Sequence, residues 1–325
     1  MPSDLSVHDN HLVAYTVHAK EKKIVFHTEF HERKPHEFTD VIFDDVLAYH
    51  FENDLFGTII FDIKEVDLTV LLKDHAMMFE AGAIIELTSL FIGSTTARRR
   101  ATGNGARYLA MPGVRMETFR EEGPLSVDFA SLRPRVEEVG AAWTQARTFR
   151  LTTPAGTDLR GSVEGRPGRV LHGLACSPGD YMAPPDIEAG TAPIEGSTSG
   201  VVVVDADLLF MGKGPLAEPV VLYIRDGKLT DVEGGERYRL TEMIDRCDDR
   251  RMSNLAEVSM AFNPAGRVCS VAMETESSLG TAHIALGNSL AYGGVVDAVA
   301  HLDCVMRDAT LELDGETVLV AGVTM

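Results

Sequence analysis

The chain of 325 residues contains little cysteine, and its four cysteines are scattered. Cys176, Cys247, Cys269 and Cys304 show neither close pairing nor the spacing of thiolate ligands. They therefore exclude a disulfide scaffold and a zinc site built from thiolates. We expect them to be small apolar side chains of the interior.

Long apolar runs are also missing. The longest, such as Val201–Val204, fall far short of the roughly 20 residues that a membrane-spanning helix needs. The segment Met1–His11 has neither the basic nor the apolar region of a secretory signal. These absences predict a cytoplasmic protein without a membrane partner.

Positive charge is scarce. Lysine and arginine number 30 against 49 aspartates and glutamates, which gives a formal net charge of −19. Such a chain repels phosphate groups, so nucleic acid and anionic membrane surfaces are excluded as partners. A small-molecule substrate is the partner that this composition favours.

Glycine and arginine are nearly absent from the first 80 residues. This segment holds one of the 29 glycines, Gly57, and a single arginine, Arg33, but eight of the eleven histidines. Alternating apolar and polar residues over 12–18 and 24–30 predict a β-hairpin, and further strands are expected at 41–43, 46–51 and 58–63. The histidines follow the strand period without the close spacing of metal ligands. Residues 1–80 therefore read as a small β-rich module of unknown role.

The remainder of the chain has a different pattern. Residues 84–114 read as strand, helix and strand, and 131–146 as an amphipathic helix with Pro134 in its first turn. A shorter helix is expected over 241–247. Asp226-Gly227 and Asp314-Gly315 each lie between alternating runs, which predicts two hairpins.

These patterns predict an α/β fold. We expect a partial, truncated α/β domain over 81–160 and a β-rich catalytic, metal-binding domain over 161–325, with the extra β-rich module over 1–80.

Only three histidines follow residue 80, and two of them have the surroundings of metal ligands. His301 and Asp303 are two residues apart on a predicted strand, so their side chains share one face. An imidazole and a carboxylate placed in this way can bind one divalent ion. His283 lies on a strand that glycines bracket.

Two glutamates are also candidate ligands for a cation. Apolar residues flank Glu257 on a strand that reads as buried, where an unpaired carboxylate is costly. Glu188 lies in a proline-rich, loop-like stretch. With the two histidines and Asp303, they form a set of oxygen and nitrogen ligands that suits a pair of divalent ions.

Several segments, in one order, resemble the thermophilic-type aminopeptidase T (leucyl aminopeptidase) family of metallopeptidases. They are Asn254–Val258, Glu276–Asn288, Tyr292–Gly294 and His301–Asp303, with Thr152–Leu159 and Thr191–Ser197 upstream. The resemblance covers about residues 81–325. It implies that two divalent ions (Zn, Co, Mn or Mg) are bound by Glu188, Glu257, His283, His301 and Asp303.

The implied activity is the removal of N-terminal residues from short peptides by a homodimer. A metal-activated water would attack the peptide bond, and Glu188 or Glu257 would carry the proton to the leaving amine. The chain departs from the family at one position, where Leu290 replaces a tyrosine and Tyr292 follows two residues later.

Two alternatives remain open. The segments are similar, more distantly, to 2,5-dihydroxypyridine 5,6-dioxygenase, a ring-cleaving enzyme with one Fe(II) bound by two histidines and a carboxylate. That enzyme carries histidine where this chain has Glu257, so the presence of Glu257, Glu188 and His283 favours the aminopeptidase. The second alternative is a non-catalytic binding protein that retains the metal ligands. Metal content separates the two enzymes, because the dioxygenase needs one iron and consumes oxygen.

Overall fold

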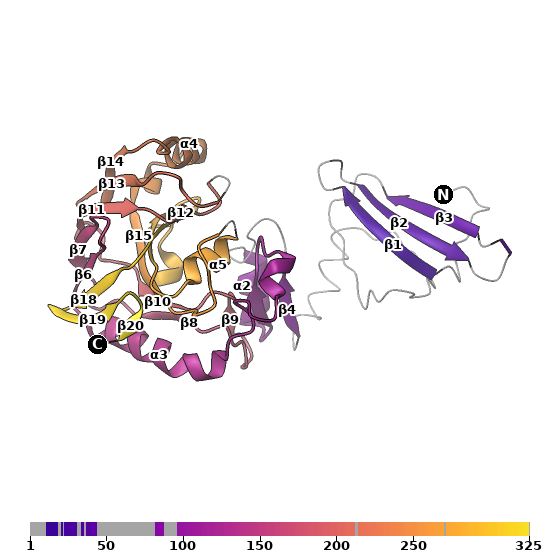
Figure 1. The fold of residues 1–325 in the computed structure, drawn as a ribbon, viewed down its shortest axis with the longest axis horizontal. Helices are drawn as coiled ribbons and strands as arrows, with labels where there is room; N and C mark the ends of the chain where they lie inside the picture. Colours follow the sequence, from indigo (N-terminus) through magenta and orange to yellow (C-terminus); the bar gives the residue numbers. More distant parts are fainter. Residues whose placement is uncertain are drawn as a thin grey trace. The chain divides into compact units, whose positions relative to one another are not determined.

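The computed structural model divides the chain into two compact units, Met1–Met78 and Phe79–Met325 (Figure 1). The residues that it describes are 11–18, 21, 23–30, 34–35, 37–43, 82–87 and 96–324, apart from 212, 213 and 270. The strands predicted at 46–51 and 58–63 lie outside these residues.

The first unit contains an antiparallel sheet in the order β1-β2-β3. Its strands are β1 (His11–His18), β2 (Lys23–Phe30) and β3 (Glu37–Phe43). The predicted hairpin is thereby confirmed. His27 of β2 forms a half-exposed pair with Asp40 at 2.8 Å, between its Nδ1 and the carboxylate. Within the described part of this unit, no three histidine, cysteine or acidic side chains come close enough to share a metal ion.

The second unit begins with a small parallel sheet. Helix α2 (Thr96–Gly103) connects β4 (Ala83–Glu86) to β5 (Arg107–Ala110), and β9 (Tyr181–Met182) pairs with the far side of β5. The predicted order of strand, helix and strand is confirmed.

Two antiparallel sheets form the larger part of the second unit. The six-stranded sheet has the order β12-β17-β16-β15-β10-β8, and the eight-stranded sheet the order β14-β13-β11-β7-β6-β18-β19-β20. The strands of the first are β8 (Arg169–Leu171), β10 (Glu188–Thr191), β12 (Asp207–Leu208), β15 (Leu255–Ala261), β16 (Ala282–Gly287) and β17 (His301–Met306). Those of the second are β6 (Thr148–Thr152), β7 (Asp158–Ser162), β11 (Ser199–Val204), β13 (Val220–Arg225), β14 (Lys228–Glu233), β18 (Thr310–Leu313), β19 (Glu316–Val320) and β20 (Val323–Thr324).

Both predicted Asp-Gly hairpins are present, as β13–β14 and β18–β19. The turn residues have positive φ, 49° and 69° at Asp226 and Gly227, and 49° and 86° at Asp314 and Gly315. Turns of this kind match the twist of the adjoining strands. Strand β7 crosses the domain boundary predicted at residue 160, because residues on both sides of it belong to the eight-stranded sheet.

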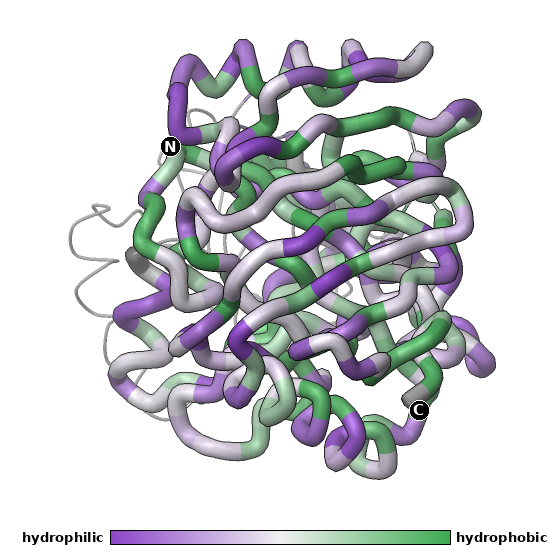
Figure 2. Tube along the Cα trace, turned by 90° about the vertical axis from the view of Figure 1, so that its left-hand side faces the viewer, coloured by the Kyte–Doolittle hydropathy of each residue, from purple (hydrophilic) through white to green (hydrophobic). Residues whose placement is uncertain are grey.

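The main core lies between these two sheets. Leu151 and Leu222 of the eight-stranded sheet and Met260 and Ile284 of the six-stranded sheet belong to one cluster of buried apolar side chains. In the eight-stranded sheet, β13 alternates buried and more exposed residues, whereas every residue of β15 and β16 is buried. Hydrophilic and hydrophobic stretches alternate along the strands that face the viewer in Figure 2. The central strands of the six-stranded sheet are therefore covered on both faces.

Helix α3 (Phe129–Gln145) packs against β8 and β10 with Val136, Val139 and Trp143 buried (Figure 1). Its N-cap is Asp128, whose side chain accepts a hydrogen bond from the Ser131 amide at 3.1 Å. The helix begins earlier than predicted, so Pro134 lies in its second turn, and the prediction for the first turn is wrong. The proline ring costs one intrahelical hydrogen bond there.

The shorter helices lie in the connections. They are α4 (Tyr238–Cys247), which contains the predicted helix at 241–247, α5 (Ala272–Ser277), and the single turns η2 (Met116–Phe119), η3 (Arg250–Ser253) and η4 (Leu290–Tyr292). Among the described helices, none has the length and apolar character to cross a membrane.

Candidate metal centre

The five ligands predicted from the sequence lie on one face of the six-stranded sheet. Side chains of a strand alternate between its two faces, and Val258, Ile284 and Cys304 point into the sandwich core. The opposite face is therefore the one that carries Glu188 on β10, Glu257 on β15, His283 on β16, and His301 and Asp303 on β17.

The proline-rich surroundings of Glu188 predicted a loop, but this residue lies in a strand. It opens β10, where it pairs with Ala261 of β15 and Leu171 of β8. Its partners are distant in sequence, so local composition does not reveal the strand.

The ligand atoms form two groups that share Glu257. Glu188, Glu257 and His283 make one group, and Glu257, His301 and Asp303 make the other, each with its ligand atoms within 4.8 Å of one another. His283 Nε2 lies 3.1 Å from Glu188 Oε2 and 3.2 Å from Glu257 Oε1. His301 Nε2 lies 2.9 Å from Glu257 Oε2 and 3.2 Å from Asp303 Oδ1.

The hydrogen bonds around His301 fit a metal ion. Its Nδ1 lies 2.7 Å from the carbonyl oxygen of Asn288, which can only accept, so Nδ1 carries the proton and donates it. This leaves the lone pair of Nε2 directed at two carboxylates, and such an arrangement of acceptors needs a cation among them. A backbone carbonyl on the second nitrogen is also the usual way in which proteins orient a metal-binding histidine.

Burial separates the two groups. The side chains of Glu188, Glu257 and His283 are at most 2% exposed, whereas those of His301 and Asp303 are 26% and 14% exposed. A small molecule can therefore reach the centre from the side of His301 and Asp303.

Strong electrostatic coupling accompanies this burial. Burial acts to raise the pKa of Glu257, but hydrogen bonds with His283 and His301 lower it to about 2. Burial and the charge of Glu257 raise the pKa of Glu188. Burial acts to lower the pKa of His301, but Asp303 and Glu257 raise it well above its usual value. The carboxylates therefore favour the protonated form of both imidazoles, whose pKa values they raise.

Three neighbouring residues that the sequence did not single out as ligands hold this centre in place. Ser259 Oγ donates a hydrogen bond to Glu257 Oε1. Tyr292 donates its hydroxyl proton to Glu188 Oε1 at 3.1 Å, and its ring stacks on His301 with the centroids 5.4 Å apart. The guanidinium group of Arg169 lies over the ring of Tyr292, with its central carbon 4.9 Å from the ring centre. Leu290, which stands where the aminopeptidase family has a tyrosine, is 51% exposed and has no hydroxyl group. The hydroxyl group that contacts the predicted ligands belongs to Tyr292.

Two further acidic side chains are buried near the centre. Asp186 and Glu276 are 2% and 7% exposed. Burial and the charge of Glu188 raise the pKa of Asp186 well above its usual value, and burial and Asp303 do the same for Glu276. Burial therefore favours the protonated form of both side chains.

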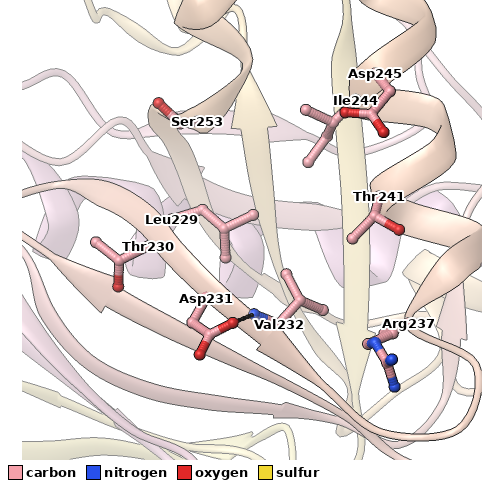
Figure 3. A pocket seen from close by; sticks show the side chains of 9 residues that line it. All are labelled: Leu229, Thr230, Asp231, Val232, Arg237, Thr241, Ile244, Asp245 and Ser253. Atoms are coloured by element: carbon pink, nitrogen blue, oxygen red, sulfur yellow. Dashed lines mark hydrogen bonds between the residues drawn. The ribbon is translucent and has the colours of Figure 1, made fainter.

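A separate pocket of about 310 Å³ lies between β14 and α4 (Figure 3). Leu229, Asp231 and Val232 line it from the strand, and Arg237, Thr241 and Ile244 from the helix and the turn before it. None of the five predicted ligands lines this pocket.

The paired groups of carboxylates and imidazoles, on one face of a sheet in a β-sandwich, form a site that could hold a metal ion. A family model of the 2,5-dihydroxypyridine 5,6-dioxygenases (NicX) matches residues 67–325. The chain therefore belongs to this family.

Two relatives show the extent of the similarity. A 2,5-dihydroxypyridine 5,6-dioxygenase of Pseudomonas putida is 25% identical over 189 residues, which are 55% of this chain and 54% of that protein. The chain thus matches about half the length of this curated relative. The solved structure of the 2,5-dihydroxypyridine dioxygenase from Pseudomonas putida KT2440 has the same fold, with a TM-score of 0.68, 20% identity, and coverage of 79% of this chain and 76% of that one.

These comparisons overturn the main functional prediction. The chain belongs to a dioxygenase family, so the predictions of a metallo-aminopeptidase, a hydrolase and a protease are wrong. The proton-transfer roles predicted for Glu188 and Glu257 in peptide hydrolysis no longer apply. The error has a chemical reason, because the same carboxylates and imidazoles suit either kind of centre. The dioxygenase named as the more distant resemblance is the better interpretation.

Proposed function

We propose that this chain is an iron(II)-dependent dioxygenase that opens the ring of a dihydroxypyridine-like substrate. The observation that carries this proposal is the family match over residues 67–325. The grouping of ligand atoms on β15 and β17 supports it.

The metal ligands in this proposal are Glu257, His301 and Asp303. They provide one nitrogen and two carboxylates, a set that fits a divalent ion but differs from the two-histidine, one-carboxylate triad of many iron(II) oxygenases. An iron(II) ion held by these residues would supply the redox chemistry that lets oxygen react with the ring of the substrate. We propose one ion for each chain, with Glu188 and His283 orienting Glu257.

The surrounding residues prepare the ligands for this task. The Asn288 carbonyl keeps the proton of His301 on Nδ1 and leaves Nε2 free to bind. Tyr292 fixes the plane of the His301 ring by stacking on it. The burial of Glu257 and Glu188 keeps bulk water from competing for their oxygens.

The test has two steps. The protein is first loaded with iron(II) in the absence of oxygen, and its consumption of oxygen is then measured in air-saturated buffer with the substrate. We expect one iron for each chain and one molecule of oxygen consumed for each molecule of 2,5-dihydroxypyridine. His301→Ala removes both iron and activity, whereas His27→Ala, a histidine of the first unit, retains both. Iron-loaded protein that leaves oxygen and the pyridine ring untouched would contradict the proposal.

A further inference from the structure

Arg169 lies beside Tyr292 at the metal centre, and its charge interacts with those of Glu188 and Glu257. It opens β8, where it pairs with Gly190 of β10. Its Nη1 donates to the carbonyl oxygen of Ala291 at 2.6 Å. Among the described residues, its buried Nε has no hydrogen-bond partner.

Aromatic rings surround the guanidinium group. Its central carbon lies 4.9 Å from the ring centre of Tyr292 and 5.7 Å from that of Tyr181. Tyr181 also stacks on Tyr108, with the centroids 5.8 Å apart. Rings interact with the face of a guanidinium group and leave the hydrogen-bond donors at its edge unsatisfied.

Unsatisfied buried donors are costly, so the edge of Arg169 calls for an acceptor. A planar, forked group of donors matches a carboxylate or another anionic oxygen better than it matches a neutral acceptor. The tyrosine rings beside it suit a flat ring that carries this oxygen.

Tyr292 connects Arg169 to the ligands, since its ring contacts both the guanidinium group and His301. Through this ring, the guanidinium group of Arg169 lies close to His301, one of the two more exposed ligands.

Charge also favours such an anchor. Glu188, Glu257 and Asp303 bring up to three negative charges, which one divalent ion and a protonated His283, 3.1 Å from Glu188, can balance. An anionic substrate would add a further negative charge, for which Arg169 supplies a positive one.

We propose that Arg169 binds the anionic oxygen of the substrate and orients its ring toward the metal ligands. The substrate class is then a hydroxylated aromatic ring, such as a pyridine, with a carboxylate or an ionised hydroxyl group. This inference rests on the proposed function, because it concerns the same site.

Equilibrium binding without oxygen tests this inference independently of turnover. Iron(II)-loaded full-length protein is titrated calorimetrically with 5-hydroxypyridine-3-carboxylate and with the matching carboxamide, which has nearly the same shape but no charge. We expect wild-type protein to prefer the carboxylate by about tenfold or more, as for a charge-assisted hydrogen bond.

The variants identify the residue responsible. Arg169→Gln should bind both compounds equally, Arg169→Lys should keep part of the preference, and Arg160→Gln, which removes the same charge from β7, should keep all of it. Iron content and circular dichroism show that each variant is folded and loaded.

Two results would overturn the inference: wild-type protein without a preference, or an unchanged preference in Arg169→Gln. A carboxylate preference that depends on Arg169, in protein that does not open 2,5-dihydroxypyridine, would support the anion site and reject the proposed activity.

Discussion

The side chain of Asn288 fixes the position of its own backbone carbonyl group, which orients His301. Replacing this side chain with alanine should therefore lower metal affinity more than it lowers the stability of the fold. Its Nδ2 donates to Asp297 Oδ1 at 3.0 Å and to the Ala298 carbonyl at 2.9 Å, and its Oδ1 accepts from the Leu290 amide at 3.1 Å. The Asn288 carbonyl itself accepts the proton of His301 Nδ1. Asn288→Ala removes the first three bonds and leaves the fourth without support.

The magnitude follows from these bonds. Each hydrogen bond contributes about 0.5–1.5 kcal/mol, and two of the three are exposed, so the free energy of unfolding should fall by about 1–3 kcal/mol. Loss of a group that orients a metal ligand lowers metal affinity by about 10–100-fold. The change in metal affinity should therefore be the clearer effect.

Asn263→Ala is the matched control. Asn263 is fully buried and also makes three hydrogen bonds, with the carbonyls of Pro124 and Pro185 and the amide of Ala265, but none with a ligand or its support. Urea denaturation should show a loss of stability at least as large as that of Asn288→Ala. Competition with a chelator for cobalt(II) should show unchanged metal affinity. Equal metal affinities in wild type and Asn288→Ala, or equal losses in the two variants, would refute the reasoning.

Three further predictions concern the frame of the site and its stability. In Gly190→Ala the new Cβ would lie 1.8 Å from Ser259 Oγ, so metal retention and melting temperature should both fall, whereas Gly103→Ala, with open space around it, should change neither. Glu274 is fully buried against two arginines that are 28% and 57% exposed, so Glu274→Gln should lower the free energy of unfolding by about 1 kcal/mol in urea, and an unchanged free energy would be inconsistent with a stabilising ion pair. Hydrogen bonds from two arginines lower the pKa of Asp158 to about 2, below its value of about 3.9 in the unfolded chain, so its stabilisation is present above pH 4 and is lost as the pH falls through 2. Because this side chain is 41% exposed, the difference in stability between wild type and Asp158→Asn should be under about 1 kcal/mol at pH 6 and should shrink toward pH 2; a constant difference would count against the ion pairs.

Local patterns were sufficient for much of the fold. The Asp-Gly turns specify their hairpins because both residues adopt positive φ there. The two-residue period of a strand placed His301 and Asp303 on one face without reference to any other part of the chain.

Residues that act through distant partners could not be found in this way. Tyr292 reaches Glu188 across 104 positions of sequence, and Arg169 is placed by its pairing with β10. The strand that begins at Glu188 exists because β8 and β15 flank it. Such contacts leave no periodic pattern in the residues around them.

The ligand set also could not decide the reaction. Glu257, His301 and Asp303 offer the same oxygen and nitrogen atoms to a hydrolytic centre and to an oxygen-activating one. The family match over residues 67–325 distinguishes the two kinds of centre, and it rests on the sequence of most of the chain rather than on the ligands.

The position of bound iron tests the central claim most directly. Crystals of the chain loaded with iron(II) without oxygen would be measured at the iron absorption edge, where anomalous scattering locates the metal. We predict one peak within bonding distance of His301 Nε2 and of the carboxylates of Asp303 and Glu257. A peak among the histidines of the first unit, with none at β15 and β17, would contradict it.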